Sequence, residues 1–106
     1  MSTFKSLMMG PATLATLMLS LALNLPVPAD LAMTGGLNLD GRICPVASVE
    51  EKVLVAKEGG YKHIILPTDN KAQWDNIEHH VKENLLVNFV SKYEEIYKIV
   101  FLKEDH

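Results

Sequence analysis

A stretch of 24 residues without a single charge, Ser6 to Ala29, constrains this chain more than any other feature. The rest of the sequence is highly charged, because residues 30–106 carry nine of the ten basic residues and all thirteen acidic ones. A stretch this apolar is stable only away from water, so it belongs inside a fold, in a membrane or in a cleaved signal segment. These possibilities predict different proteins.

As a secretory signal, the stretch would use Lys5 as its basic end, Leu14–Leu25 as its apolar segment and a cleavage site ending at Ala29. The product would then be a small secreted protein of the 77 residues from Asp30 onward. As a membrane span the stretch has nearly enough length, but glycine, proline, threonine, serine and asparagine residues interrupt it. A membrane span is therefore not favoured.

As a buried helix over about residues 12–24, the same stretch would lie in the core of a folded domain. Pro11 suits the first turn of a helix, because the N–H that it lacks would have no partner there. Asn24 would end the helix, and Pro26 would prevent its continuation. The pattern alone leaves the helix and the signal segment open.

Length and composition exclude several classes of protein. A chain of 106 residues is at most one small domain over residues 1–106, and 48% hydrophobic residues are too many for a disordered chain. A net charge of −3 provides no basic surplus for general nucleic-acid binding. The single cysteine, Cys44, excludes an intrachain disulfide and a zinc site of several thiolates. The sequence has no phosphate-binding glycine loop, so it offers no means of binding ATP by itself.

Beyond the uncharged stretch, strand and helix patterns alternate. Strand patterns form a hairpin over 30–44 and single strands at His63–Leu66 and Val87–Val90. Helix patterns occupy 48–58, one or two short pieces within 69–84, and the end of a strand-and-helix unit over 87–102. This alternation predicts an α/β fold with a small mixed sheet and flanking helices.

Residues suited to helix ends mark two of these helices. Ser48 and Glu51 have the spacing of a capping box at the start of the 48–58 helix, and Gly59-Gly60 suits a left-handed C-cap at its end. Ser91 and Glu94 repeat the capping-box spacing before the last helix. Both boxes predict a helix that starts immediately after the serine.

Lys52 is the strongest candidate for chemistry among the charged residues. It lies three residues after Val49 and four before Ala56 on the expected helix, so it borders the apolar stripe. A lysine held against apolar surface loses solvation and can act as a general base, or its stem can cover the core edge while its ammonium group reaches water. His79 and Glu83 share a helix face, but two ligands are too few, so no metal site is predicted.

Several motifs, in order, resemble one protease family. Residues 31–46, LAMTGGLNLDGRICPV, are similar to the hairpin of the Lon proteolytic domain, and residues 51–60, EKVLVAKEGG, resemble its lysine helix. The strand His63–Pro67 with Asn70 after it, and residues 89–101, resemble the following elements, most like those of mitochondrial members. The resemblance extends from about Phe4 to Leu102 and implies the C-terminal part of a Lon-type proteolytic domain.

The resemblance implies descent from an ATP-dependent serine peptidase with a Ser-Lys dyad. In such a dyad the lysine takes the serine proton as the hydroxyl attacks the peptide carbonyl. Lys52 matches the dyad lysine, and Thr34 matches a family threonine that could orient the ammonium group. The resemblance also places Leu14–Leu25 in the helix that follows the nucleophile loop, which favours the buried helix.

The nucleophile is where this sequence departs from the family. The family pattern reads PKDGPSAG; an alignment without gaps places Met9 at the serine, and anchoring on Gly10-Pro11 places Ala12 there. Neither side chain can attack a carbonyl. Ser6 and Ser20 lie away from the aligned position. The sequence also has Gly36 where the family has glutamate and Ala47-Ser48 where it has paired glycines.

The sequence therefore predicts a diverged Lon-type fragment that is inactive alone and acts through assembly with Lon-like subunits or with copies of itself. The ATPase module, which uses ATP in the family, and the first half of the proteolytic domain are expected to be absent, so no cofactor is expected. One alternative is an active serine endopeptidase on protein or peptide substrates, with a serine that is unaligned or supplied by a partner. The other alternative is the secreted protein, whereas the family resemblance implies the mitochondrial matrix or the cytoplasm.

Overall fold

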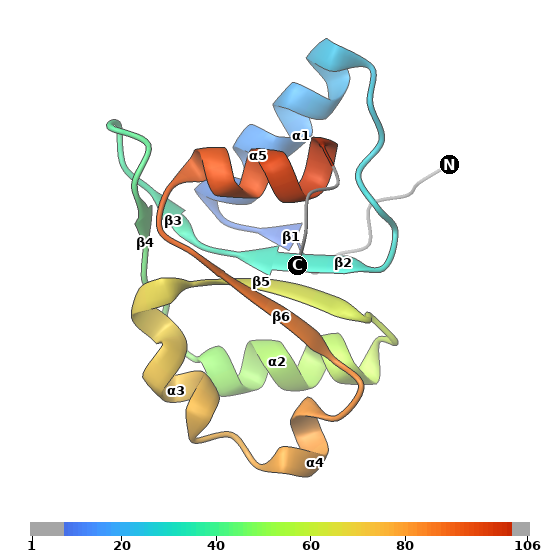
Figure 1. The fold of residues 1–106 in the computed structure, drawn as a ribbon, viewed down its shortest axis with the longest axis vertical. Helices are drawn as coiled ribbons and strands as arrows, with labels where there is room; N and C mark the ends of the chain where they lie inside the picture. Colours follow the sequence, from blue (N-terminus) through green and yellow to red (C-terminus); the bar gives the residue numbers. More distant parts are fainter. Residues whose placement is uncertain (1–7, 103–106) are drawn as a thin grey trace.

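A four-stranded sheet between two layers of helices forms the centre of the molecule in a computed structural model, which describes residues 8–102 (Figure 1). Along the chain the first elements are β1 (Met8–Met9), α1 (Pro11–Leu23), β2 (Leu31–Thr34), β3 (Gly36–Leu37), β4 (Ile43–Cys44) and α2 (Val49–Glu58). They are followed by β5 (His63–Pro67), the 3-10 turn η1 (Thr68–Asn70), α3 (Lys71–Asp75), α4 (His79–Lys82), β6 (Leu86–Val90) and α5 (Tyr93–Phe101). The α/β class predicted from the alternation is confirmed.

The main sheet has the order β1-β2-β5-β6, and all of its neighbouring strands are parallel. Antiparallel pairing occurs in a separate two-stranded ribbon of β3 and β4. The prediction of a hairpin over 30–44 is therefore wrong in its extent. Only residues 36–44 form a hairpin, because residues 31–34 pair with β1 and β5 instead. The hairpin also pairs with the chain after β6, where the backbone N–H of Ile43 donates to the carbonyl of Ser91 at 2.8 Å.

Each face of the sheet carries its own hydrophobic core, because side chains alternate between faces along a strand. In β2, Leu31 and Met33 point to one face and Ala32 to the other. The first face is covered by α1 and α5, with a core of Ala12, Val27, Leu31, Met33, Ile43, Ile65, Val90, Ile96 and Val100. The second is covered by α2, α3 and α4, with a core of Ala32, Val49, Val53, Ala56, Ile64, Leu66, Trp74, Ile77 and Leu85.

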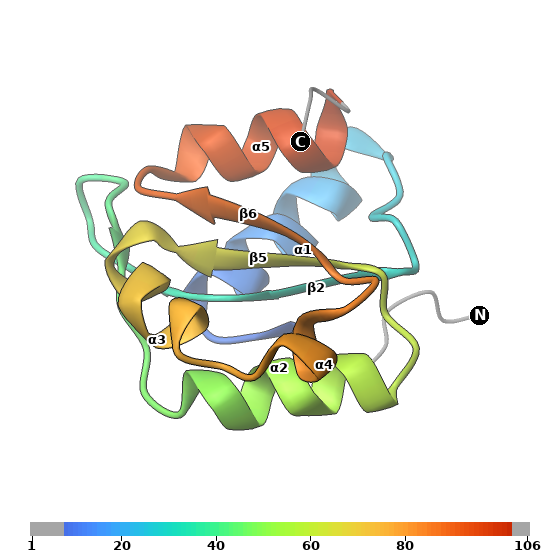
Figure 2. The same cartoon turned by 60° about the horizontal axis from the view of Figure 1, so that its bottom comes forward.

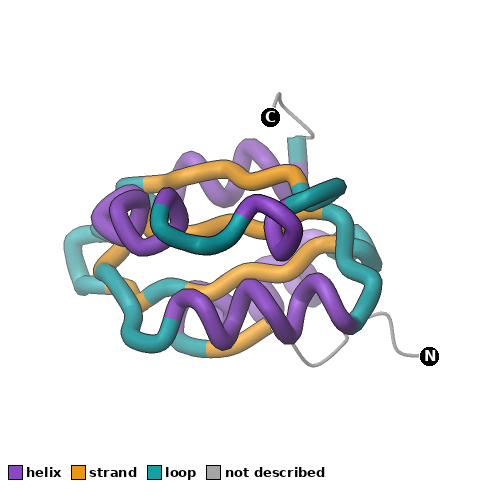
Figure 3. Tube along the Cα trace, turned by 90° about the horizontal axis from the view of Figure 1, so that it is seen from below, coloured by secondary structure: helices purple, strands orange, loops and turns teal. Residues whose placement is uncertain are grey.

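The figures show the same three layers from other sides. Figure 2 shows α5 above the strands and α2 below them. Viewed from below, the tube in Figure 3 has helices lying across the near face of the strands, where Figure 1 places α2, α3 and α4. A sheet covered on both faces explains why β2 and β5 are apolar runs without polar alternation.

The two crossover connections at the centre of the sheet lie on opposite faces. The connection from β1 to β2 passes through α1 on one face, whereas that from β2 to β5 passes through α2 on the other. Both connections move one strand in the same direction across the sheet. Because one passes over one face and the other over the opposite face, the two connections have opposite handedness. Since parallel crossovers are right-handed in nearly all proteins, one of these two has the rare left-handed form.

The uncharged stretch supplies α1, and one side of this helix is packed into the domain. Ala12, Thr16 and Ser20 are buried on it, and the Thr16 hydroxyl shares a 2.8 Å hydrogen bond with the hydroxyl of Tyr93 on α5. Asn24 ends the helix in the left-handed conformation, as its position predicts. Within residues 8–102, none of the helices combines the length and apolar character that a bilayer span requires.

The capping predictions for α2 and α5 are each wrong in one detail. Ser48 has a left-handed backbone, with φ of 59°, and its side chain makes no capping hydrogen bond, so the box with Glu51 is absent. At the other end Gly60 is left-handed as predicted, and the N–H of Tyr61 donates to the carbonyl of Ala56. Before α5, the carboxylate that accepts the backbone N–H groups of residues 91 and 92 belongs to Glu95, one residue beyond the predicted Glu94.

Candidate functional site

The carboxyl ends of β1 and β2 bring three of the predicted site positions together. Met9 is the last residue of β1 and pairs in register with Thr34, the last residue of β2. The backbone N–H of Ala12, at the start of α1, donates to the carbonyl of Gly35 at 3.3 Å. Both alignments of the family serine therefore place it beside Thr34, and neither position carries a hydroxyl group.

Gly10 makes this close approach of α1 to β2 possible. Its backbone has φ of 92° and ψ of 177°, a combination open almost only to glycine. A Cβ atom at Gly10 would lie 3.1 Å from the carbonyl oxygen of Gly35, which is tighter than ordinary contact. The strand-to-helix turn at the candidate site therefore depends on glycine at position 10.

Lys52 lies in the first turns of α2, at the same end of the sheet. Helix α2 leads into β5 at that strand's amino end, so its own N-terminus lies toward the carboxyl ends of the strands. Lys52 is half-buried, and its Nζ donates to the backbone carbonyl of Ala47 at 3.0 Å. Among the described residues, no hydrogen bond joins Lys52 to Thr34, although Thr34 is buried at the neighbouring strand end. The topology thus assembles the predicted residues at one end of the sheet without linking this pair.

Asn70 holds the loop that leads to Lys52. Its side chain is 1% exposed; Oδ1 accepts the N–H of Val46 at 2.9 Å, and Nδ2 donates to the carbonyl of the same residue at 3.0 Å. Val46 directly precedes Ala47, whose carbonyl receives the Lys52 ammonium group. The sequence showed Asn70 only as a motif position; the signal that could have suggested its role was a polar residue three positions after the end of the buried strand β5.

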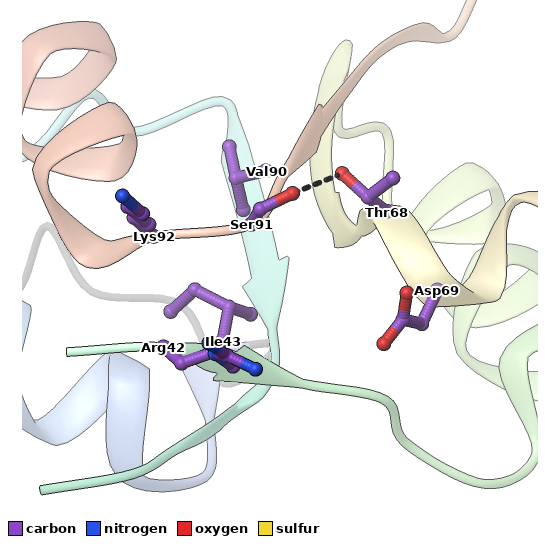
Figure 4. A pocket seen from close by; sticks show the side chains of 7 residues that line it. All are labelled: Arg42, Ile43, Thr68, Asp69, Val90, Ser91 and Lys92. Carbon is purple, nitrogen blue, oxygen red and sulfur yellow. Dashed lines mark hydrogen bonds between the residues drawn. The ribbon is translucent and has the colours of Figure 1, made fainter. Parts of the chain in front are cut away.

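A polar pocket of about 280 Å³ opens at the carboxyl ends of β5 and β6 (Figure 4). The hydroxyl of Ser91 donates to that of Thr68 at 3.1 Å. Figure 4 shows the Asp69 carboxylate on the wall opposite Arg42. The pocket is lined by Arg42, Ile43, Thr68, Asp69, Val90, Ser91 and Lys92, none of them among the predicted site residues.

The two histidines of α4 face solvent. His79 and His80 on α4 are exposed, and His80 Nδ1 lies 3.4 Å from the carboxylate of the equally exposed Glu78. Within residues 8–102, no group of three or more histidine, cysteine, aspartate or glutamate side chains is arranged to hold a metal ion.

Comparison with known proteins identifies the family. The sequence profile of the Lon protease (S16) C-terminal proteolytic domain matches residues 9–103. The chain belongs to this Lon family. The match extends over Thr34, Lys52 and Asn70, and it begins at Met9, one of the two positions to which the family serine can be aligned.

Relatives named as mitochondrial Lon protease homologs share much of the sequence. The protein from Oryza sativa subsp. japonica is 46% identical over 98 residues, which are 90% of this chain and 10% of the relative. That from Ostreococcus lucimarinus is 45% identical over 92 residues, or 84% of this chain, and that from Mus musculus is 40% identical over 100 residues, or 92%. The Lon-family chain therefore spans about a tenth of the length of these curated relatives.

Proposed function

We propose that this chain is a diverged Lon-type proteolytic segment that keeps the dyad lysine, Lys52, and does not hydrolyse peptides on its own. Its role would be that of a structural partner to Lon-like subunits or to copies of itself. The names of its relatives support a place in the mitochondrial matrix. The packing of α1 into the domain supports an uncleaved N-terminus, because removal up to Ala29 would take the whole helix away.

The observation that carries this proposal is the absence of a nucleophile where the family has its serine. A peptidase of this kind needs a hydroxyl within reach of both its lysine and the substrate carbonyl. Met9 and Ala12, the two alignments of that position, both lie at the β1–α1 turn beside Thr34. Ser20 lies at the far end of α1, where its hydroxyl donates to the carbonyl of Leu25, and Ser6 lies outside the described residues.

The surroundings of Lys52 give further support. A general base needs a free lone pair directed at the nucleophile. The Nζ of Lys52 donates to the carbonyl of Ala47, five residues earlier in the chain, and among the described residues it has no hydrogen bond to a hydroxyl group. An ammonium group held in this way serves as a cap for its own loop, which is a role that needs no serine.

The experiment uses two readouts on the purified chain. It is incubated with a fluorogenic peptide, and separately with a serine-directed phosphonofluoridate followed by an intact-mass measurement. We expect neither hydrolysis nor a covalent adduct, and we expect the intact mass to include residues before Asp30. A mass beginning at Asp30 would favour the secreted protein instead.

Two matched lysine variants distinguish hydrolysis that depends on Lys52 from hydrolysis by a contaminating peptidase. Lys52→Met removes the dyad lysine, whereas Lys57→Met removes a lysine on the same helix that is also half-buried and also donates to a backbone carbonyl at 3.0 Å. Hydrolysis or an adduct lost in Lys52→Met but kept in Lys57→Met would overturn the proposal and favour an active enzyme with an unaligned serine. Met9→Ser and Ala12→Ser then test which alignment is right, because an adduct should form only at the position that faces the lysine.

A further inference from the structure

The polar pocket at the carboxyl ends of β5 and β6 lies in a crevice that the topology of the sheet creates. After Pro67, at the end of β5, the chain turns through η1 into α3 on one face of the sheet, whereas after Val90, at the end of β6, it turns into α5 on the other face (Figure 2). In open parallel sheets, ligands bind in crevices outside the carboxyl ends of the strands at points of this kind. This crevice is not the one at the ends of β1 and β2, where Met9 and Thr34 meet. It is a second place at which the fold can hold a ligand.

Hydrogen bonds join the three walls of this pocket. The β3–β4 hairpin is tied to the junction between β6 and α5 at both of its ends: the N–H of Ile43 donates to the carbonyl of Ser91, and the N–H of Tyr93 donates to the carbonyl of Gly41, each at 2.8 Å. The junction is tied to η1 by the 3.1 Å hydrogen bond from the Ser91 hydroxyl to that of Thr68 (Figure 4). A pocket with walls held in this way is formed before a ligand arrives, which lowers the ordering cost of binding.

The facing walls of the pocket carry opposite charges. Arg42 is the only arginine in the chain, and Figure 4 shows it opposite the carboxylate of Asp69. Within residues 8–102 neither side chain forms an ion pair, with the other or with a third group. The planar guanidinium fork matches a carboxylate through two parallel hydrogen bonds, and an aspartate carboxylate accepts hydrogen bonds from an ammonium group. The two walls therefore suit a ligand that carries both a carboxylate and an ammonium group.

A ligand with a single charge fits the surroundings less well. Lys92 adds a second positive charge to the lining, and Glu95 places a negative charge beside it. The Glu95 carboxylate accepts the backbone N–H groups of Ser91 at 2.6 Å and Lys92 at 3.0 Å, so these groups at the start of α5 are not available to an anion. Two positive and two negative side chains therefore surround the pocket, and their sum attracts neither a simple anion nor a simple cation.

The size and the floor of the pocket indicate a small ligand. Its volume of about 280 Å³ is at the lower end of the range for small-molecule pockets. Ile43 and Val90, which are 3% and 1% exposed, give it an apolar lining that water cannot reach from behind. Charged hydrogen bonds made beside such a lining are stronger than they are in open water.

We propose that this pocket binds a small molecule with a free carboxylate and a free ammonium group, which is the chemistry of an α-amino acid or of a short peptide. The carboxylate lies against Arg42 and the ammonium group against Asp69, and the hydroxyl groups of Thr68 and Ser91 supply further hydrogen-bonding partners. Binding needs neither Lys52 nor a nucleophilic serine. The inference therefore goes beyond the proposed function and does not depend on it.

Titration of the isotopically labelled full chain, followed through the NMR signals of its backbone amides, tests the proposal. Two probes, L-alanine and dialanine, carry both charged groups; N-acetylalanine lacks the ammonium group, and alaninamide lacks the carboxylate. We expect saturable shifts at residues 68–70 and 91–93 with a millimolar dissociation constant, since so small a ligand makes few contacts. Either blocked probe should bind at least about tenfold more weakly than L-alanine, because it loses one hydrogen-bonded charge pair. The tighter of the two unblocked probes distinguishes a free amino acid from a short peptide as the source of this chemistry.

Variants connect each charged end of the ligand to one side chain. Arg42→Met should weaken L-alanine binding at least about tenfold but leave the weak binding of alaninamide unchanged, and Asp69→Asn should do the same with N-acetylalanine as the unaffected probe. Arg42→Lys keeps the charge but loses the planar fork, so it should also bind L-alanine more weakly than the wild-type chain. Lys62→Met and Asp75→Asn are the matched controls, because both side chains are exposed and lie outside the pocket. Circular dichroism should show every variant folded.

Three results would overturn the proposal. N-acetylalanine or alaninamide binding as tightly as L-alanine would mean that one charged end is sufficient. Equal losses in Arg42→Met and Lys62→Met would reduce the binding to general attraction between charges, and the absence of shifts with millimolar probe would mean that the pocket takes no such ligand. Each of these results leaves the inactive Lon-type segment in place, whereas a covalent serine adduct would reject the proposed function without changing the expected binding of L-alanine.

Discussion

Asn70 holds both backbone polar groups of Val46, accepting its N–H at 2.9 Å and donating to its carbonyl at 3.0 Å. The two residues lie 24 positions apart, on opposite sides of α2 and β5 in the sequence. Because the Asn70 side chain is buried, this pair fixes the loop from which Lys52 and its helix begin. The candidate site is thus supported by the amide side chain of Asn70.

Asn70→Ala should lower the free energy of unfolding by about 2–4 kcal/mol, because it leaves two polar groups of Val46 without partners in a partly buried loop. Chemical denaturation of the two proteins measures the difference. Asn76→Ala, at an exposed position of the following segment, should change stability by less than about 0.5 kcal/mol. Equal effects of the two substitutions would show that the Asn70 contact has no special importance.

Lys52→Met should cost less than about 1.5 kcal/mol of stability, because it removes one hydrogen bond between a half-buried ammonium group and a carbonyl. Lys57→Met removes the equivalent bond to Glu83 and should cost a similar amount. Thermal or chemical unfolding of both variants tests this. A much larger loss for Lys52 alone would mean that this lysine is a structural requirement of the fold.

Ser48→Gly should stabilise the chain by about 0.5–1 kcal/mol, since Ser48 has a left-handed backbone that glycine adopts without strain. The gain is reduced by the greater freedom of glycine in the unfolded chain. The serine side chain makes no capping bond, so Ser48→Ala should bring no gain. Unfolding curves in which alanine stabilises as much as glycine would contradict this account.

Gly10→Ala should destabilise the chain by about 1–3 kcal/mol, because alanine at φ of 92° and ψ of 177° is strained. It would also press its Cβ against the carbonyl of Gly35. Gly41→Ala separates the two causes, since Gly41 has φ of 86° but nothing within 4 Å of an added Cβ. In denaturant titrations Gly10→Ala should be the more damaging substitution; the reverse order would show that the β1–α1 turn can relax.

Stability should fall as the pH rises above 10, through Tyr93. Burial raises the pKa of its hydroxyl above the ordinary value of 10.0, an effect that the hydrogen bond from Thr16 partly offsets. The unfolded chain therefore loses this proton at a lower pH than the folded chain, so the stabilisation is complete below pH 10 and is lost as the pH rises through the folded value.

The measurement for Tyr93 is the free energy of unfolding between neutral pH and the alkaline range, compared with that of Tyr93→Phe. The variant should be less stable at neutral pH, because Thr16 loses its 2.8 Å partner, and its stability should decline less steeply above pH 10. Tyr61→Phe, at a tyrosine that packs against the core on the opposite face of the sheet, is the control. Parallel curves for wild type and Tyr93→Phe would exclude the effect.

Several local features of this protein could be predicted from its sequence, because they depend on interactions between residues close together in the chain. The apolar run at His63–Pro67, the left-handed Asn24 and the glycine at 60 are set by neighbours only a few residues away. The order and spacing of the motifs likewise indicated the Lon family, and within it the position of Lys52, because a motif is a set of residue types at fixed spacings that can be read from the sequence directly. The absence of a serine at the aligned positions also needed only the sequence.

Contacts between distant segments were decided only by the tertiary structure. Residues 31–34 entered the parallel sheet, and α1 and α2 took opposite faces, since these choices depend on which apolar surfaces meet. Ser48 is left-handed although its spacing suited a cap, and it follows a loop that Asn70 holds from 24 residues away. The sequence by itself determined the α/β class and the family. The packing energy of two separate cores determined how those elements meet, because no local pattern encodes a contact between residues 24 or 77 positions apart.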